Sequence, residues 1–183
     1  MAEYTAYFNG EWIPFSQVKI DPTDRGFRVA DVIFDSGRTF NGKSFRMKEH
    51  IDRLYRSLKY VRIDPGLSAE EMLDISEETI RRNDHFLAEA GDFNFSQFVT
   101  RGPGRFGFIE SAGPPTVCVR VGPCDFGRHA RHYKDGARGV ITRTRSYSAD
   151  TLDPKIKHYS RMHFNLAELE AADVDPGAWP ILT

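Results

Sequence analysis

The sequence predicts an α+β fold: an N-terminal domain of antiparallel strands and helices, followed by the incomplete start of a second α/β domain. Two Asn-Gly pairs between aromatic-rich runs, two amphipathic helical patterns, and a later strand, helix and final strand lead to this prediction. We expect the first domain over residues 1–125, a polar linker over 126–138 and the incomplete, cofactor-binding second domain over 139–183.

The two Asn-Gly pairs, at 9–10 and 41–42, predict β-hairpins. Both central residues of a type I′ turn need a positive φ, which Asn and Gly tolerate better than other residues. Each pair stands between aromatic residues that are typical of strands. The N-terminal part is therefore expected to form an antiparallel sheet.

Two helices are expected next. Apolar residues recur at steps of three and four over residues 47–60, which predicts an amphipathic helix. Ser68 can cap a second helix while the side chain of Glu71 reaches back to the backbone of Ser68. Gly91 is expected to end that helix, because glycine adopts the left-handed backbone found there.

The rest of the chain predicts four strands and one more helix. The strands are expected over residues 93–100, 116–121, 139–147 and 178–183, and the helix over residues 159–172. The final strand has no hairpin partner in the sequence, so its ladder would have to be satisfied elsewhere.

Charge and composition exclude several classes of protein. Lys and Arg number 25 and Asp and Glu 26, so the net charge of -1 gives no overall attraction to nucleic acid or to a membrane surface. No apolar run is long enough for a membrane helix, and the first residues lack a secretion signal. With only Cys118 and Cys124 available, a reducing cytoplasm fits best.

Two lysines stand just before the last predicted helix. Lys155 and Lys157 are two residues apart, so each amine could depress the pKa of the other and leave one nucleophilic. A solvated helix edge explains the same spacing. The pattern alone does not choose between these readings or between the two lysines.

Three other positions could bind an anion. Helical spacing puts Arg53 opposite the apolar face of its helix, where an arginine either stays in solvent or binds a phosphate or carboxylate. Strand alternation places Phe34, Ser36 and Arg38 on one face. That face could line a polar substrate pocket or could simply face solvent.

The segment around residue 130 carries histidines and arginines. His129 and His132 lie near Cys124, but a fourth ligand at compact spacing is absent, so we expect no metal site. The basic run over residues 128–132 could contact nucleic acid, yet a solvated linker is the favoured interpretation, and no nucleic-acid partner is expected.

Several segments together resemble one enzyme family, the fold type IV aminotransferases, which include branched-chain aminotransferases, D-amino-acid transaminases, (R)-selective amine transaminases and aminodeoxychorismate lyase. The segments are Tyr-Phe-Asn-Gly-Glu-Trp at 7–12, Asp-Arg-Gly-Phe at 24–27, Asn-Gly-Lys at 41–43, Glu-His-Ile-Asp-Arg-Leu at 49–54, Val-Thr-Arg-Gly at 99–102, and Ile-Lys at 156–157 with Glu-Ala at 170–171. Their order and spacing, rather than any one of them, carry the resemblance.

The resemblance implies a homodimeric enzyme that uses pyridoxal 5'-phosphate to move an amino group between an amino acid or amine and a 2-oxo acid. It assigns Lys157 as the lysine that forms the Schiff base and moves the proton, and Arg53 as the residue that binds the cofactor phosphate. Phe34 matches a pocket aromatic residue and Arg38 stands where some members have a lysine. Arg105 is the nearest match to an arginine that holds the substrate carboxylate.

Two alternatives stay open at this stage. A lyase of the same family would share Lys157 and Arg53 but release pyruvate. A non-catalytic fragment that only folds and dimerises is the other alternative, because the family's pyridine-binding glutamate and later phosphate-binding loops would follow Thr183. We therefore expect this chain alone to bind the cofactor weakly.

Overall fold

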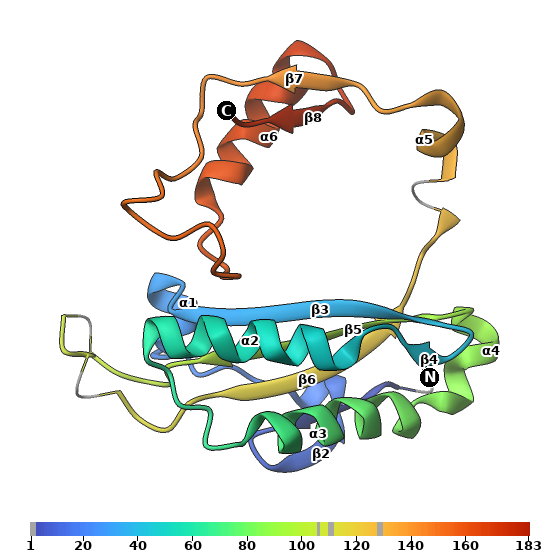
Figure 1. Cartoon of the computed structure of the whole chain (residues 1–183), viewed down its shortest axis with the longest axis vertical. Helices are drawn as coiled ribbons and strands as arrows, with labels where there is room; N and C mark the ends of the chain where they lie inside the picture. The colour runs from blue at the N-terminus through green and yellow to red at the C-terminus, as the bar shows by residue number, and fades with distance from the viewer. Residues whose placement is uncertain (1–2, 106, 110–111, 128–129) are drawn as a thin grey trace. The chain divides into compact units, whose positions relative to one another are not determined.

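The computed structural model describes residues 3–105, 107–109, 112–127 and 130–183, and the chain forms two compact units (Figure 1). The first unit comprises Met1–Cys124 together with Lys155–Tyr159, and the second comprises Asp125–Pro154 and Ser160–Thr183. The short segment Lys155–Tyr159 thus packs with the first unit although its flanking residues belong to the second.

The first unit contains six strands and four α-helices in its described part. The strands are β1 (Thr5–Phe8), β2 (Glu11–Pro14), β3 (Val32–Phe40), β4 (Lys43–Ser44), β5 (Phe93–Thr100) and β6 (Val117–Pro123). The helices are α1 (Arg25–Val29), α2 (Met47–Val61), α3 (Ala69–Arg82) and α4 (Leu87–Ala90), with 3₁₀ turns η1 (Phe15–Gln17) and η2 (Asp84–Phe86).

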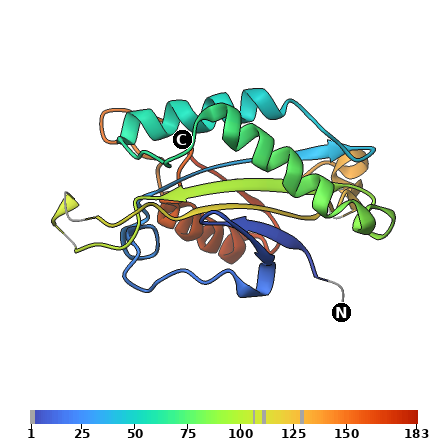
Figure 2. The ribbon, with the colours of Figure 1, turned by 90° about the horizontal axis from the view of Figure 1, so that it is seen from below.

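The six strands form one antiparallel sheet with the order β2-β1-β6-β5-β3-β4. Helices α2 and α3 lie on one face of this sheet (Figure 2). Alternate residues of β5, beginning with Phe93 and Phe95, point into the layer between sheet and helices and are fully buried. Burying each such side chain stabilises the fold by about 1.5–3 kcal/mol.

Both predicted hairpins are confirmed. In each turn the Asn and the Gly have positive φ, 50° and 98° in the first turn and 50° and 74° in the second. The second turn is also held from below, because the buried Asp92 accepts hydrogen bonds from Asn41 N at 3.1 Å and Gly42 N at 3.0 Å.

The helix predicted over residues 47–60 and the Ser68 cap are confirmed, but the predicted end of the second helix is wrong. The helix ends at Arg82, and Gly91 instead caps the short helix α4. Asn83 explains the difference: its fully buried amide donates to Thr79 O at 2.7 Å and Thr5 O at 2.9 Å and accepts from Thr5 N at 2.8 Å. Side-chain bonds to β1 thus replace further helical turns.

The second unit contains α5 (Ala130–Asp135), β7 (Gly139–Ile141), α6 (Met162–Val174) and β8 (Trp179–Ile181). Helix α5 lies inside the segment predicted as a linker. Strand β7 is shorter than predicted, and α6 begins three residues later than the expected helix. The expectation that the final strand lacks a nearby partner is wrong, because β8 pairs in parallel with β7, a pairing that a connection through a helix allows.

No helix within the described ranges is long and apolar enough to cross a membrane.

Asn83→Ala is expected to lower the free energy of unfolding by about 2 kcal/mol, since it leaves the Thr5 amide and carbonyl without partners in the interior. Urea denaturation followed by circular dichroism would measure the loss. Asn94→Ala, at an exposed position of the same unit, should change stability by less than about 0.5 kcal/mol. Equal effects of the two substitutions would contradict the role given to Asn83.

Candidate active site

The outer and inner faces of β3 differ as the alternation predicted. Asp35 and Thr39 are buried under the helices, whereas Ser36 and Arg38 are exposed on the opposite face. Phe34 and Ser36 help to line a hollow of about 420 Å³ over the sheet, together with Ser96, Arg120 and Tyr159 among others. Arg38 lines a second hollow of about 320 Å³ with Phe40, Phe45 and His50.

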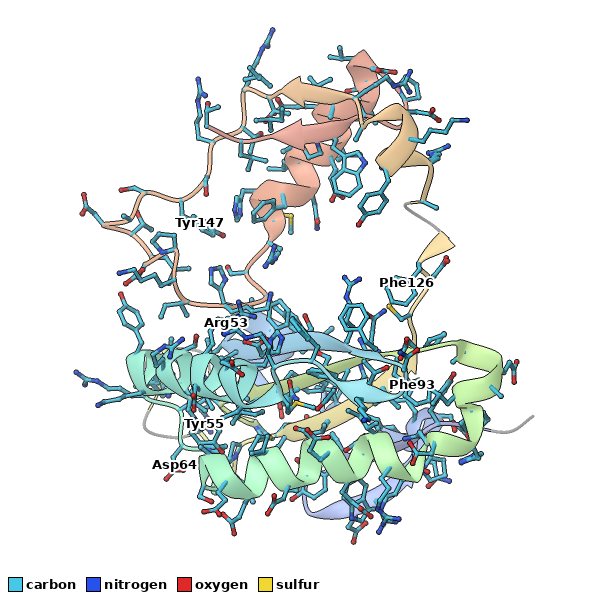
Figure 3. The ribbon with its side chains drawn as sticks, turned by 45° about the vertical axis from the view of Figure 1, so that its right-hand side comes forward. Arg53, Tyr55, Asp64, Phe93, Phe126 and Tyr147 are labelled. Carbon is cyan, nitrogen blue, oxygen red and sulfur yellow. The ribbon has the colours of Figure 1, made fainter. Side chains whose placement is uncertain are left out.

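A buried carboxylate on the inner face binds two basic residues of α2. Asp35 accepts hydrogen bonds from Arg53 Nε at 2.6 Å and from Arg53 Nη2 at 2.7 Å, and its Oδ1 lies 2.8 Å from His50 Nδ1. The Asp35 side chain is 0% exposed and that of Arg53 is 42% exposed. Figure 3 shows Arg53 and Tyr55 leaving α2 on opposite sides.

The charge of this cluster is held by hydrogen bonds. Burial by itself would raise the pKa of Asp35, but the hydrogen bonds from Arg53 and His50 outweigh it, so the pKa of Asp35 lies below its ordinary value. The bond to Asp35 in turn raises the pKa of Arg53. Asp35 therefore stays ionised and Arg53 stays a cation at neutral pH.

Local sequence explains why these groups meet. His50 and Arg53 are three residues apart on α2 and so lie on neighbouring positions of its surface. Gly37 leaves room for them on β3: a Cβ there would come within 2.3 Å of the Phe95 ring and 2.8 Å of His50 Nε2. Glycine at this position is required by close packing.

Lys157 is held at the edge of β3. Phe34 N donates to Lys157 O at 3.1 Å and Tyr159 N donates to Val32 O at 3.4 Å, so the segment runs antiparallel to the strand. The Lys157 amine lies 4.3 Å from the centre of the Phe34 ring, and the centre of the Tyr159 ring lies 4.2 Å from that of Phe34. Lys157 is half-buried whereas Lys155 is exposed, which separates the two lysines.

Ser57 connects the lysine to the arginine. The Ser57 hydroxyl donates to Arg53 O at 3.0 Å, and the Ser57 Oγ accepts from Lys157 N at 3.4 Å. Ser57 is almost completely buried, so this contact is shielded from water. The structure thereby brings Arg53, Lys157 and Phe34, three of the five predicted site residues, to one end of the contact between β3 and α2.

The two other predicted site residues lie farther along the fold. Arg38 is on the same face of β3 as Phe34 and is exposed. Arg105 is exposed in the loop between β5 and β6, where its carbonyl accepts from Arg25 Nη1 at 3.1 Å. Among the described residues, its hydrogen bonds do not bring it to Arg53 or Lys157.

Sequence reasoning did not single out Asp35 or Ser57. Asp35 was assigned to the face opposite Phe34, but nothing in the alternation said that its partners would come from α2. The signal was present in α2, where His50 and Arg53 sit beside each other and require a carboxylate if that surface is covered. Ser57 gave no signal, since its role depends on a segment 100 residues away.

The Glu-Ala pair at 170–171 has a structural place in the second unit. Glu170 accepts from Thr144 Oγ1 at 2.5 Å and from Arg143 N at 2.8 Å, which ties α6 to the chain that follows β7. The hydrogen bond from Thr144 lowers the pKa of Glu170. Ala171 beside it is fully buried.

In the described part of the chain, no three His, Cys, Asp or Glu side chains gather where a metal ion could bind. Residues 128 and 129 lie outside the described residues, so the structure does not test the histidine pair or the basic run named above.

The donor groups of the first unit fit a ligand with two features. Arg53 can donate to a phosphate with the N–H groups that Asp35 leaves over, because a guanidinium has five N–H donors and Asp35 uses two of its nitrogens. The half-buried amine of Lys157 can attach to a carbonyl carbon. One ligand with both groups fits this pair of residues.

Gly37→Ala is expected to lower the free energy of unfolding by about 1–3 kcal/mol, because the new methyl group overlaps the buried Phe95 ring. Thermal and urea unfolding would measure the change. Gly122→Ala in β6 is the matched control, since a Cβ there meets nothing within 4 Å; a similar loss in both variants would show that strand glycines matter for some other reason than this contact.

Acid is expected to destabilise the first unit through Asp35. Because the pKa of Asp35 is lowered in the folded chain, its contribution is complete above the unfolded value of about 3.9 and is lost as pH falls through the lower folded value. Asp35→Asn should therefore show a shallower loss of unfolding free energy between about pH 6 and pH 2, measured by urea titration. An unchanged slope would contradict this.

The chain matches known proteins across most of its length. A family model described as amino-transferase class IV matches residues 32–178. A Methanocaldococcus jannaschii protein described as a branched-chain-amino-acid aminotransferase is 33% identical over 168 residues, covering 90% of this chain and 54% of that protein. The D-alanine aminotransferase of Staphylococcus haemolyticus is 34% identical over 77 residues, or 42% of this chain and 27% of that protein.

Solved structures agree on the fold. A T.th. branched-chain amino acid aminotransferase, complexed with N-(5'-phosphopyridoxyl)-L-glutamate, matches with a TM-score of 0.82 at 21% identity over 100% of this chain and 59% of that one. The Escherichia coli branched-chain enzyme matches with a TM-score of 0.83 at 18% identity over 95% of this chain and 58% of the other. The chain thus spans little more than half the length of these relatives. It belongs to the amino-transferase class IV family.

Proposed function

We propose that this chain supplies the reactive lysine and the phosphate-binding arginine of a pyridoxal-phosphate-dependent aminotransferase. The reaction moves an amino group between an amino acid or amine and a 2-oxo acid. The observation that carries the proposal is the joint attachment of Lys157 and Arg53 to Ser57, which ties the amine-bearing segment to the arginine-bearing turn of α2. The names of the relatives support the same activity.

Lys157 is proposed to attach to the cofactor and, once the substrate amine has displaced it, to move a proton at the substrate carbon. Its contact with Phe34 supports this role because the ring covers one side of the amine and limits its freedom. Arg53 is proposed to bind the cofactor phosphate through its exposed edge. The bound pyridoxal ring would supply the electron sink.

The outer face of β3 is the proposed substrate side. Phe34 offers an apolar wall next to the amine, and Arg38 on the same face offers a cation for a carboxylate. Arg120, which sequence reasoning missed, lines the same hollow as Phe34 and is a further cation there. Arg105 stays a proposal from the resemblance alone.

Assembly as a homodimer and a cytoplasmic location are also proposed. The resemblance supports the dimer. Both cysteines are buried free thiols, and burial raises the pKa of Cys118 to about 12. An unreactive thiol fits a chain that relies on no disulfide and works in a reducing compartment.

The test is reduction of the purified protein with borohydride at saturating pyridoxal phosphate, followed by peptide mapping. A phosphopyridoxyl group is expected on Lys157, and Lys157→Ala should remove more than about nine-tenths of the label. Lys155→Ala is the matched control and should keep it. Label spread equally over the exposed lysines, or none at saturation, would overturn the proposed function.

A further inference from the structure

We propose that Asp35 is the positioning residue of the phosphate-binding site and holds Arg53 with one edge of its guanidinium turned outward. The inference rests on the proposed function of Arg53 and deepens it. Asp35 touches neither cofactor nor substrate in this proposal. It acts by fixing the residue that does.

The hydrogen bonds divide the guanidinium into two edges. Asp35 takes the edge formed by Nε and Nη2, at 2.6 Å and 2.7 Å. The edge formed by Nη1 and the second N–H of Nη2 keeps three donors. Among the described residues, the one further contact of this edge is His50 Nδ1, at 3.4 Å from Nη2.

Burial sets the direction in which the second edge points. The carboxylate is completely buried, whereas 42% of the Arg53 side chain is exposed. The inner edge is therefore in the protein and the outer edge is at the surface. Two parallel N–H groups at a surface match the spacing of two phosphate oxygens.

The carboxylate is itself fixed from three directions. Its Oδ1 accepts from Ser36 N at 2.7 Å and lies 2.8 Å from His50 Nδ1, in addition to its bond with Arg53. The space at Gly37 lets the His50 ring approach this closely. A rotation of Asp35 would break all these contacts together, so the carboxylate is a rigid reference for Arg53.

A second Asp–Arg pair in the same unit shows the opposite arrangement. Arg101 donates to Asp31 from Nε at 2.7 Å and from Nη2 at 3.2 Å, much as Arg53 does to Asp35. Its outer edge is filled, because Nη2 donates to Val61 O at 2.7 Å and Nη1 to Arg62 O at 2.9 Å. Only 14% of that side chain is exposed. Asp31 is therefore a matched control that holds an arginine with a structural task.

Removing Asp35 has two opposed effects on phosphate binding. The negative charge of Asp35 repels a phosphate, so its removal would strengthen binding if charge alone mattered. Its removal also frees the long Arg53 side chain to adopt many rotamers, which weakens binding. The proposal states that the second effect is the larger, and the sign of the change decides between them.

The experiment compares pyridoxal phosphate with pyridoxal, which lacks the phosphate. For the full chain and each variant, the half-saturating concentration of each aldehyde is measured by borohydride trapping on Lys157. Dividing the value for pyridoxal by the value for pyridoxal phosphate isolates the phosphate contribution. A general loss of stability moves both values and leaves this ratio unchanged.

Asp35→Asn is expected to lower the ratio about tenfold, the order set by the rotamer freedom that a released arginine regains. Asp31→Asn should lower the melting temperature but leave the ratio as in the wild type. A ratio that is unchanged or raised in Asp35→Asn would overturn the proposal.

Two further variants guard against other outcomes. Arg53→Lys keeps the charge but cannot make the paired bonds, so it should lose as much as Asp35→Asn, and the double variant should lose little more. Additive losses would contradict positioning, even if Asp35→Asn alone folds poorly. Arg53→Ala tests the proposed function separately: if its ratio equals that of the wild type, Arg53 does not bind the phosphate and the assignment of that residue fails, whatever Asp35 does.

Discussion

The first unit depends on one buried charge. An ionised carboxylate is costly to remove from water unless hydrogen-bonding cations accompany it. Asp35 lies on the covered face of β3, so the helix above it must present its basic residues to the sheet at that point. Arg53 and His50 meet this need, and in doing so they fix how α2 is rotated about its axis and how far it is shifted along the strand.

The placement of the lysine follows from the placement of that helix. Once Arg53 faces Asp35, the next turn of α2 brings Ser57 to the edge of β3, where the backbone of Lys157 reaches it. The other side of the lysine segment pairs with the backbone of Phe34. Residues distant in the sequence are thus set against one short stretch of strand, and each depends on the same register between helix and sheet.

The sequence predicted those features that are decided locally. The Asn-Gly turns, the Ser68 cap and the alternation along β3 each depend on a few neighbouring residues, and each is found in the structure. The end of α3 could not be predicted in this way, because Asn83 stops the helix by binding β1. Helical spacing placed Arg53 correctly at the surface but did not reveal the carboxylate that holds it.

The same limit applies to function, as the two Asp–Arg pairs show. Both arginines lie in segments that resemble family motifs, and both donate side-on to a largely buried aspartate. Residue type and pattern therefore do not distinguish them. The difference lies in the second edge of each guanidinium: backbone carbonyls fill it in Arg101, and solvent reaches it in Arg53. An arginine whose donors are all used inside the fold can only stabilise it. One that is fixed from behind and open in front can bind an anion without first losing its freedom of motion, and this is the physical reason to assign the phosphate to Arg53.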